Sequence, residues 1–423
     1  MTTARLYRTI TTSLLALALS LSLVSVGQTA EPTLIRSDTK EWSQWRGPAR
    51  DGISLETGLL QAWPADGPDR KWEAKGIGRG YSSPIIAEGS IYITGDVEED
   101  LVISAFSLDG KLLWTKKNGK AWEKSFPGAR ASCTYDEGKL YSMNAHGRLA
   151  CLNAKTGEEL WAVNVLEQCE GENIIWGICE AVIVHGDLVF ATPAGKKGLV
   201  VALNKNTGKT VWTTPAIADE KPSYASPILV SLGEQTLLIN NVTNHAFAVD
   251  IETGKLCWKV PKIDPKNRVT TIPVLSGNNL VLTNGSRGFG GVYGVEFDGS
   301  SGKKIWRKEI SISHGSAVCL DGKAYGATRR GEVKGWVSVD VKTGEAKKLS
   351  DLGVGSVIYA DGRFYCLTQT GTMTLQQPTA EGFKSVGSFQ IADAKDIWAH
   401  PVISGGKLYL RVQDALYCYD IGS

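Results

Sequence analysis

Short runs of alternating apolar and polar residues, separated by turns that contain glycine, dominate the chain after residue 70. Each run has the length of a single strand, and alternation with a period of two is typical of a strand with one buried face. The period of 3.6 residues that marks an amphipathic helix is missing from this part of the sequence. The pattern therefore predicts a protein built of β-strands joined by hairpins.

One turn pattern recurs: an apolar run, an Asp or Asn, a turn with glycine and usually a tryptophan. The clearest copy is the segment 248–258, in which Asp250 precedes Gly254 and Trp258. An Asp at this place hydrogen-bonds its own backbone, and glycine supplies the positive φ that closes the turn. A copy that begins at Asp340 has Leu349 in place of the tryptophan. The other tryptophans follow one another at intervals of 46 to 51 residues, at Trp114, Trp161, Trp212, Trp258 and Trp306.

A second hairpin signal lies upstream of these turns, for example at Glu137-Gly138-Lys139. Two hairpins per unit, with a period near 50 residues, are typical of the four-stranded blade of a propeller. The innermost strands then number eight, with starts near Ser83, Ser132, Cys179, Ser226, Ile272, Ser316, Ser356 and Pro401.

The last unit ends at Ser423, inside its turn, and lacks an outer strand. Lys71-Trp72-Glu73 precedes the first inner strand and has the pattern of an unpaired outer strand. We expect it to complete the last blade, because ring closure removes exposed strand edges. The sequence thus predicts an all-β fold: an eight-bladed β-propeller of four-stranded blades over residues 71–423, closed by an N-terminal strand.

The first thirty residues have the features of a secretory signal peptide. Arg5 and Arg8 precede a near-continuous apolar run from Leu14 to Val26, and Ala30 is the expected cleavage site. The alternative, a membrane anchor, needs a run of about 20 residues. We expect a flexible linker over 31–41 and, over 42–70, a strap that packs on the propeller; the alternative for this strap is a partner-binding arm.

Charge and cysteine content narrow the possible partners. Loss of Arg5 and Arg8 would leave 44 basic and 44 acidic residues, a balance that argues against nucleic-acid binding by counterion release. No later stretch approaches membrane-spanning length. The eight cysteines include no CxxC pair, which argues against structural zinc. Cys169 and Cys179 flank a loop and are the candidate disulfide, and the other cysteines read as buried thiols.

The segment 248–258 resembles the tryptophan-docking repeat of the pyrroloquinoline-quinone-like (PQQ-like) propellers, which include quinoprotein alcohol dehydrogenases and the outer-membrane assembly lipoprotein BamB. The resemblance covers residues 72–423, and the segment 42–54 is similar to the leader of exported propellers of this type in Planctomycetes. It implies a structural role, holding neighbouring blades together, for Trp72, Trp114, Trp161, Trp212, Trp258 and Trp306.

The resemblance leaves two functions open. Quinoprotein dehydrogenases typically carry adjacent cysteines near the cofactor and calcium ligands, and this chain has no Cys-Cys pair. BamB is tethered through a lipidated cysteine, and here no cysteine precedes Cys133. Signatures of common hydrolases, metalloproteases and NTP-binding proteins are missing. We expect a non-enzymatic scaffold in the periplasm or cell envelope that binds a protein or peptide without cofactor or metal; the alternative is an oxidoreductase that acts on alcohols with PQQ and calcium.

The candidate site is the mouth of the central channel, which the residues that open each inner strand would line. Aromatic and cationic side chains there suit an anionic or planar ligand; the alternative is a solvated rim with packing between blades. Glu180 is the carboxylate in this set and the candidate base for the enzymatic alternative. The expected channel-mouth residues are Arg79, Tyr81, Arg130, Trp176, Glu180, Tyr224, Arg268, His314, Trp398 and His400.

Overall fold

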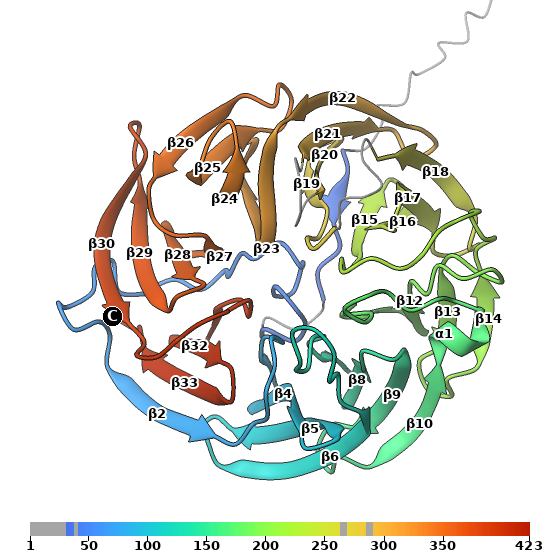
Figure 1. The fold of residues 1–423 in the computed structure, drawn as a ribbon, viewed down its shortest axis with the longest axis horizontal. Coiled ribbons are helices and arrows are strands. Elements are labelled where there is room, and N and C mark those ends of the chain that lie inside the picture. The colour runs from blue at the N-terminus through green and yellow to red at the C-terminus, as the bar shows by residue number, and fades with distance from the viewer. Residues whose placement is uncertain (1–30, 38–40, 263–268, 285–290) are drawn as a thin grey trace, which may run out of the picture.

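A computed structural model describes the chain except for residues 1–30, 38–40, 263–268 and 285–290. The described residues form eight antiparallel sheets arranged as blades around a central axis (Figure 1). The predicted eight-bladed propeller is therefore confirmed. One short helix, α1 (Val165–Gln168), follows the outer strand of the second blade. No helix in this described part is long and apolar enough to cross a membrane.

Each blade runs from an inner to an outer strand. The first four blades consist of β3 (Ile85–Ala87), β4 (Ser90–Val97), β5 (Asp100–Ser107) and β6 (Leu112–Lys120); β7 (Thr134–Asp136), β8 (Lys139–Met143), β9 (Arg148–Asn153) and β10 (Glu159–Asn164); β11 (Ile183–His185), β12 (Leu188–Ala191), β13 (Val201–Asn204) and β14 (Thr210–Thr213); and β15 (Ile228–Leu232), β16 (Gln235–Asn241), β17 (His245–Asp250) and β18 (Leu256–Pro261).

The remaining blades follow the same order. They consist of β19 (Val274–Ser276), β20 (Asn279–Asn284), β21 (Gly291–Phe297) and β22 (Gly302–Lys308); β23 (Ile310–Leu320), β24 (Lys323–Gly331), β25 (Gly335–Asp340) and β26 (Ala346–Ser350); β27 (Gly355–Ala360), β28 (Arg363–Thr368), β29 (Thr372–Pro378) and β30 (Phe383–Gln390); and β31 (Val402–Ser404), β32 (Lys407–Val412), β33 (Ala415–Asp420) and β2 (Arg70–Lys75).

The eighth blade takes its outer strand from the beginning of the propeller. Strand β2 pairs antiparallel with β33, and Trp72 lies opposite Cys418. Ring closure by an N-terminal strand is thus confirmed, and it satisfies backbone groups that an open edge would leave unpaired.

The recurrent turn has the chemistry that its sequence predicts. The Asp250 carboxylate accepts hydrogen bonds from the Thr253 amide (2.9 Å) and hydroxyl (2.7 Å). Gly254 follows with φ = 71°, a conformation that costs glycine little. These local contacts fix the position of the tryptophan that follows.

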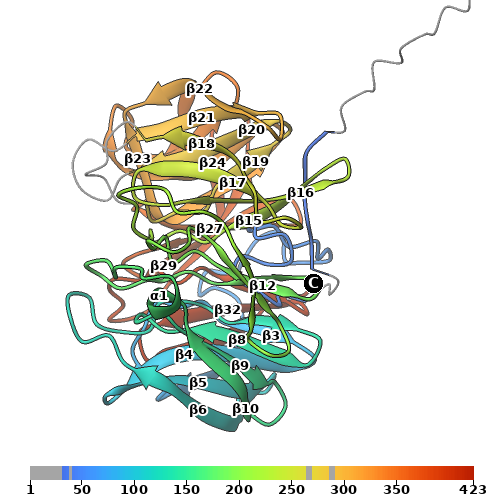
Figure 2. The same cartoon turned by 90° about the vertical axis from the view of Figure 1, so that its right-hand side faces the viewer.

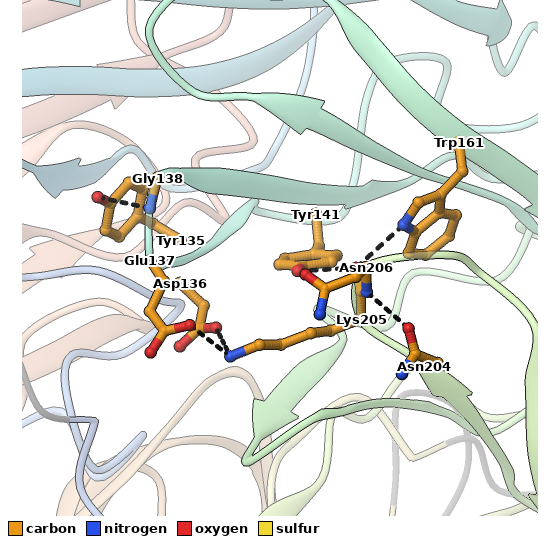
Figure 3. Close-up of polar contacts among 9 residues, drawn as sticks. All are labelled: Tyr135, Asp136, Glu137, Gly138, Tyr141, Trp161, Asn204, Lys205 and Asn206. Atoms are coloured by element: carbon orange, nitrogen blue, oxygen red, sulfur yellow. Dashed lines mark hydrogen bonds and ion pairs between the residues drawn. The ribbon is translucent and has the colours of Figure 1, made fainter.

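Each repeat tryptophan lies against the turn glycine of the next blade. A Cβ atom on Gly208 would lie 2.7 Å from the ring of Trp161, so only glycine permits this approach. The Trp161 indole also donates a hydrogen bond to the Lys205 carbonyl of the next blade (3.0 Å), as Figure 3 shows. The other five pairs are Trp72 with Gly110, Trp114 with Gly157, Trp212 with Gly254, Trp258 with Gly302, and Trp306 with Gly344.

The prediction for the sixth blade was wrong by one residue. Trp258 is the fourth residue after Gly254, and the fourth residue after Gly344 is Lys348, so a lysine and not Leu349 occupies the tryptophan position. Leu349, the next residue, is partly buried against the apolar cluster between the sixth and seventh blades. A different tryptophan packs between the sixth and seventh blades. Trp336 is fully buried and lies 6.4 Å from Phe383, whose ring is in turn 4.9 Å from Phe364.

The N-terminal segment supplies two further contacts with the ring. Phe389 of the seventh blade packs on Gly67, where a Cβ would lie 2.7 Å from its ring; the segment thus provides the glycine that receives this aromatic ring. Strand β1 (Thr33–Leu34) pairs with β15, so part of the segment expected to be a flexible linker is held by the fourth blade. Figure 2 shows this blue segment along one face of the ring.

Candidate binding site

The central channel is closed from one face by residues 42–50. This segment crosses the axis in Figure 1, and every residue in it except Trp45 is buried. It lies along the inner strands of the first two blades: the Tyr135 amide donates to the Ser43 carbonyl (2.8 Å) and the Ile86 amide to the Trp42 carbonyl (2.9 Å). We call residues 42–50 the plug.

Two buried arginines anchor the plug to inner strands from different blades. Arg50 donates to the carbonyls of Ala181 (2.7 Å) and Pro227 (3.3 Å) in the third and fourth blades. Arg46 donates to the Ala317 carbonyl (2.7 Å) and to His400 Nδ1 (3.1 Å), in the sixth and eighth blades. Burial lowers the pKa of Arg46 to about 10 and that of Arg50 to about 9. Both stay charged at neutral pH, stabilised by these oriented acceptors.

A cavity of about 370 Å³ lies against the plug, at the residues that precede the inner strands. Buried residues surround its base, among them Ser132, Ala181, Ser226 and His400, and the plug contributes the partly exposed Trp45. Because the plug fills the channel behind Trp45, the cavity is a blind funnel. Its other lining residues are Tyr81, Phe126, Arg130, Trp176, Cys179, Tyr224, Thr270, His314, Arg329, Arg330, Gln369, Asp396 and Trp398.

Aromatic rings form a nearly continuous wall in the funnel. Trp398 stacks on Tyr81 (4.5 Å between ring centroids) and on His314 (4.4 Å). The wall extends through Phe126, which lies 5.2 Å from Trp398 and 5.8 Å from Trp176. Trp176 lies 5.3 Å from Tyr224. Rings that hold one another in this way present flat apolar surfaces to a ligand at small entropic cost.

The two histidines in the lining are neutral. His400 accepts from Arg46 at Nδ1 and therefore donates from Nε2 to the His314 carbonyl (3.0 Å). Burial, with a smaller contribution from the nearby charges of Arg46 and Arg329, lowers the pKa of His400 to about 3 and that of His314 to about 4. The charged groups of the lining are thus the three arginines and Asp396, so the funnel carries excess positive charge.

Seven of the ten expected channel-mouth residues line this cavity: Tyr81, Arg130, Trp176, Tyr224, His314, Trp398 and His400. Arg79 is exposed beside Tyr81 and is not part of the lining. Arg268 lies outside the described residues. Cys169 and Cys179 are both free thiols, and Cys179 Sγ donates to the Tyr224 carbonyl (3.3 Å), so the candidate disulfide is not formed.

Glu180 points away from the funnel. Its neighbours Cys179 and Ala181 line the cavity, and alternation along extended backbone turns Glu180 to the opposite side. It is 2% exposed and accepts hydrogen bonds from the amide (3.0 Å) and hydroxyl (3.3 Å) of Thr192. Burial raises its pKa to about 8, and the charge of Arg50 opposes this shift. Glu180 is therefore not placed to act as a base on a ligand in the funnel.

Sequence reasoning missed several lining residues because they do not open inner strands. Trp45 belongs to the plug, Phe126 to a loop, and Arg329 and Arg330 to the second strand of the sixth blade. Trp45 had been assigned to the strap, and nothing local indicates that the strap enters the channel. The adjacent Arg329 and Arg330 are visible in the sequence, but the repeat pattern places neither of them near the axis.

Residues 98–349, more than half of the chain, match the family described as outer membrane protein assembly factor BamB. The chain belongs to this family. The BamB protein of Burkholderia pseudomallei is 25% identical over 363 residues, which cover 73% of this chain and 87% of that relative. BamB from Moraxella catarrhalis superimposes with a TM-score of 0.60 at 14% identity, covering 84% of this chain and 100% of that one. At this identity the superposition shows the shared fold alone.

Part of the chain is also similar in sequence to quinoprotein dehydrogenases. The quinoprotein ethanol dehydrogenase of Pseudomonas aeruginosa is 31% identical over 167 residues, which are 34% of this chain and 25% of the dehydrogenase. The chain thus matches about a quarter of that enzyme's length. The quinohemoprotein alcohol dehydrogenase of Comamonas testosteroni superimposes with a TM-score of 0.64 at 13% identity, over 92% of this chain and 81% of that chain, which again shows the fold alone.

The funnel has side chains that suit the quinone of a PQQ–calcium site, but it lacks ligands for the calcium ion. Its arginines and aromatic rings suit a planar, carboxylated quinone. Calcium takes six to eight oxygen ligands, whereas the lining offers one carboxylate, Asp396, and one amide side chain, Gln369. Within the described ranges, no group of three or more His, Cys, Asp or Glu side chains is arranged to hold a metal. The lining residues that the structure describes do not fit calcium.

Proposed function

We propose that this protein is an exported, non-catalytic propeller of the cell envelope that binds a peptide segment of a partner protein in its funnel. The observation that carries the proposal is the blind, aromatic cavity on the propeller axis. Concave apolar sites with a few polar groups are the usual form of a ligand site. Membership of the BamB family supports a scaffold role and the envelope location, and the apolar N-terminal run supports export.

The lining also supports binding without catalysis. A general base must lie within hydrogen-bond reach of the substrate proton and have a pKa near the working pH. The two lining histidines have strongly lowered pKa values, and Glu180 faces away from the cavity. Asp396 is exposed at the mouth.

Selection of displayed random peptides on the purified protein tests this proposal. Selected peptides should bind wild type and Leu160→Ala equally, because Leu160 lies on the outer strand β10 and is 46% exposed. They should lose about tenfold or more in affinity on Trp176→Ala and on Phe126→Ala, as expected for aromatic contact residues. Failure to enrich any peptide, or peptides indifferent to both funnel variants, refutes the proposal.

The second candidate, a PQQ-dependent alcohol oxidoreductase, is favoured by the local similarity to quinoprotein dehydrogenases and by the cationic aromatic funnel. Titration with PQQ and calcium, followed by quinone absorbance and by dye reduction with primary alcohols, separates the two functions. We expect neither tight binding nor turnover. Calcium-dependent dye reduction would replace our proposal with this second one, whereas binding without turnover would indicate a ligand-sensing scaffold.

A further inference from the structure

We propose that the funnel selects acidic peptide segments that carry an aromatic side chain, with the aromatic ring held by Phe126 and Trp176 and the acidic groups by Arg329 and Arg330. This inference rests on the proposed function and adds the chemistry of the partner. It is carried by three features of the funnel: a preformed aromatic pair, unbalanced positive charge, and apolar surface that stays open to solvent at the rim.

The aromatic pair is held at some conformational cost. Phe126 has φ = 56°, a left-handed conformation that is unfavourable for a residue with a Cβ. Phe126 is nevertheless 41% exposed, so burial of the ring offsets only part of that cost. An exposed aromatic ring on a strained backbone is more readily explained by contact with a ligand than by stability.

Arg130 fixes both rings through their backbones. Its guanidinium donates to the Phe126 carbonyl (2.8 Å) and to the Trp176 carbonyl (2.5 Å). The two rings meet edge to face, 5.8 Å apart at 80°. Arg130 also donates to the carbonyls of Ser125 and Gly128. Its guanidinium is thus bonded to the backbone around the two rings, and the Phe126–Trp176 pair is pre-organised for a ligand.

The positive charge available to a ligand comes from the sixth blade. Arg329 and Arg330 are exposed at the mouth. Arg329 donates to the Gln369 side chain, and Arg330 makes no side-chain hydrogen bond or ion pair with the described residues. Asp396 is the single carboxylate of the lining, and both histidines are neutral. Carboxylates are therefore the groups that the mouth attracts.

The shape of the site favours a chain over a free small molecule. Ile175, next to Trp176 in the chain and outside the lining, is 57% exposed, and Phe126 in the lining is 41% exposed, so apolar surface at the rim stays open to solvent. A molecule that fits wholly inside about 370 Å³ would leave this rim in water. An extended peptide can place one ring in the funnel and run on across the rim, as in other aromatic-lined peptide grooves.

Fluorescently labelled peptides of equal length test the inference by anisotropy at low ionic strength. The first carries a tyrosine flanked by aspartates, the second a tyrosine flanked by lysines, and the third an alanine flanked by aspartates. The first should bind at least about tenfold more tightly than the other two, because it satisfies both the rings and the arginines.

Variants with matched controls test which residues bind the aromatic ring and which select for acidic residues. Phe126→Ala should weaken the acidic tyrosine peptide about tenfold, and Leu160→Ala should leave it unchanged. Arg329→Gln combined with Arg330→Gln should reduce the preference for aspartate over lysine to within about threefold. The control pair Lys303→Gln and Lys304→Gln, on the outer strand β22, should keep that preference. Circular dichroism verifies that each variant is folded.

The outcomes separate this inference from the proposed function. Equal binding of the acidic and basic tyrosine peptides, still weakened by Phe126→Ala, overturns acidic selectivity and leaves a peptide-binding funnel. Equal binding of the tyrosine and alanine peptides overturns the aromatic requirement. If no peptide, including those selected by display, depends on Phe126 or Trp176, the inference and the proposed function both fail.

Discussion

Replacement of Trp258 by alanine should destabilise the propeller by about 4 kcal/mol. The side chain is 5% exposed and packs 6.0 Å from Phe297 between the fourth and fifth blades. A tryptophan buries about 150–250 Å², which at about 25 cal/mol per Å² gives about 4–6 kcal/mol. Large-to-small changes of buried aromatic residues typically cost about 3–5 kcal/mol, so the two ranges overlap near 4 kcal/mol.

The same site offers a control through its indole nitrogen. Trp258 Nε1 is buried without a hydrogen-bond partner, whereas Trp161 Nε1 donates to the Lys205 carbonyl (3.0 Å). Trp258→Phe keeps most of the apolar contact and removes an unsatisfied donor, a group that costs about 1–3 kcal/mol when buried. Trp161→Phe loses a hydrogen bond, although the Lys205 carbonyl keeps its second donor, the Tyr141 hydroxyl (3.1 Å). We therefore expect Trp258→Phe to be the milder of the two phenylalanine variants.

Urea unfolding followed by far-ultraviolet circular dichroism measures these free energies without relying on the altered tryptophan fluorescence. The expected order of stability is wild type, Trp258→Phe, Trp161→Phe and Trp258→Ala. An unchanged unfolding midpoint in Trp258→Ala would refute the docking role of this ring. Equal losses in Trp258→Phe and Trp258→Ala would show that ring packing does not set the cost.

Three further predictions follow from the strap, a buried carboxyl and an interblade ion pair. Deletion of residues 31–73 should cost more than the about 3–5 kcal/mol of one lost docking tryptophan, whereas deletion of 31–41 removes the pairing of β1 with β15 and peripheral contacts such as the Arg36–Asp51 ion pair, and leaves β2 in place; similar urea midpoints for the two truncations would contradict the closure argument. The raised pKa of Glu180, about 8 against 4.5, means that the folded state keeps a proton that the unfolded state releases, so this contribution to stability is present below about pH 4.5 and lost as the pH rises to 8. Glu180→Gln should therefore gain stability over wild type as the pH rises through this window, and a pH-independent difference in urea midpoints would reject the assignment. Lys205 Nζ binds Asp136 (2.7 Å) and Glu137 (2.8 Å) across two blades (Figure 3), so Lys205→Met should lower the thermal midpoint more than Lys197→Met, which breaks an exposed pair with Glu170; equal shifts would argue against a role for the interblade pair.

The sequence by itself determined the blades, because the interactions that define them are local. The turn at Asp250 and Gly254 is specified by residues within five positions of one another, and the alternating runs on either side carry their own strand pattern. Repetition of this unit then predicted the ring, its closure by β2 and the places of the docking tryptophans. The sixth blade shows the limit of pattern reading, because the tryptophan position of this copy was assigned to Leu349 and is in fact one residue earlier, at Lys348.

The tertiary structure alone decided which side chains share the funnel. Strand alternation reverses the direction of a side chain with each residue, so Ala181 reaches the cavity and its neighbour Glu180 does not. Trp45, Phe126 and Arg330 come from the plug, a loop and a second strand, and no local interaction links them in the sequence. The path of the plug depends on long-range hydrogen bonds, such as that of Arg50 to Ala181, 131 positions away. Contacts between residues so far apart in the sequence form only when the blades close around the axis. Composition and periodicity therefore predicted the ring, and they could not predict which side chains meet at its centre.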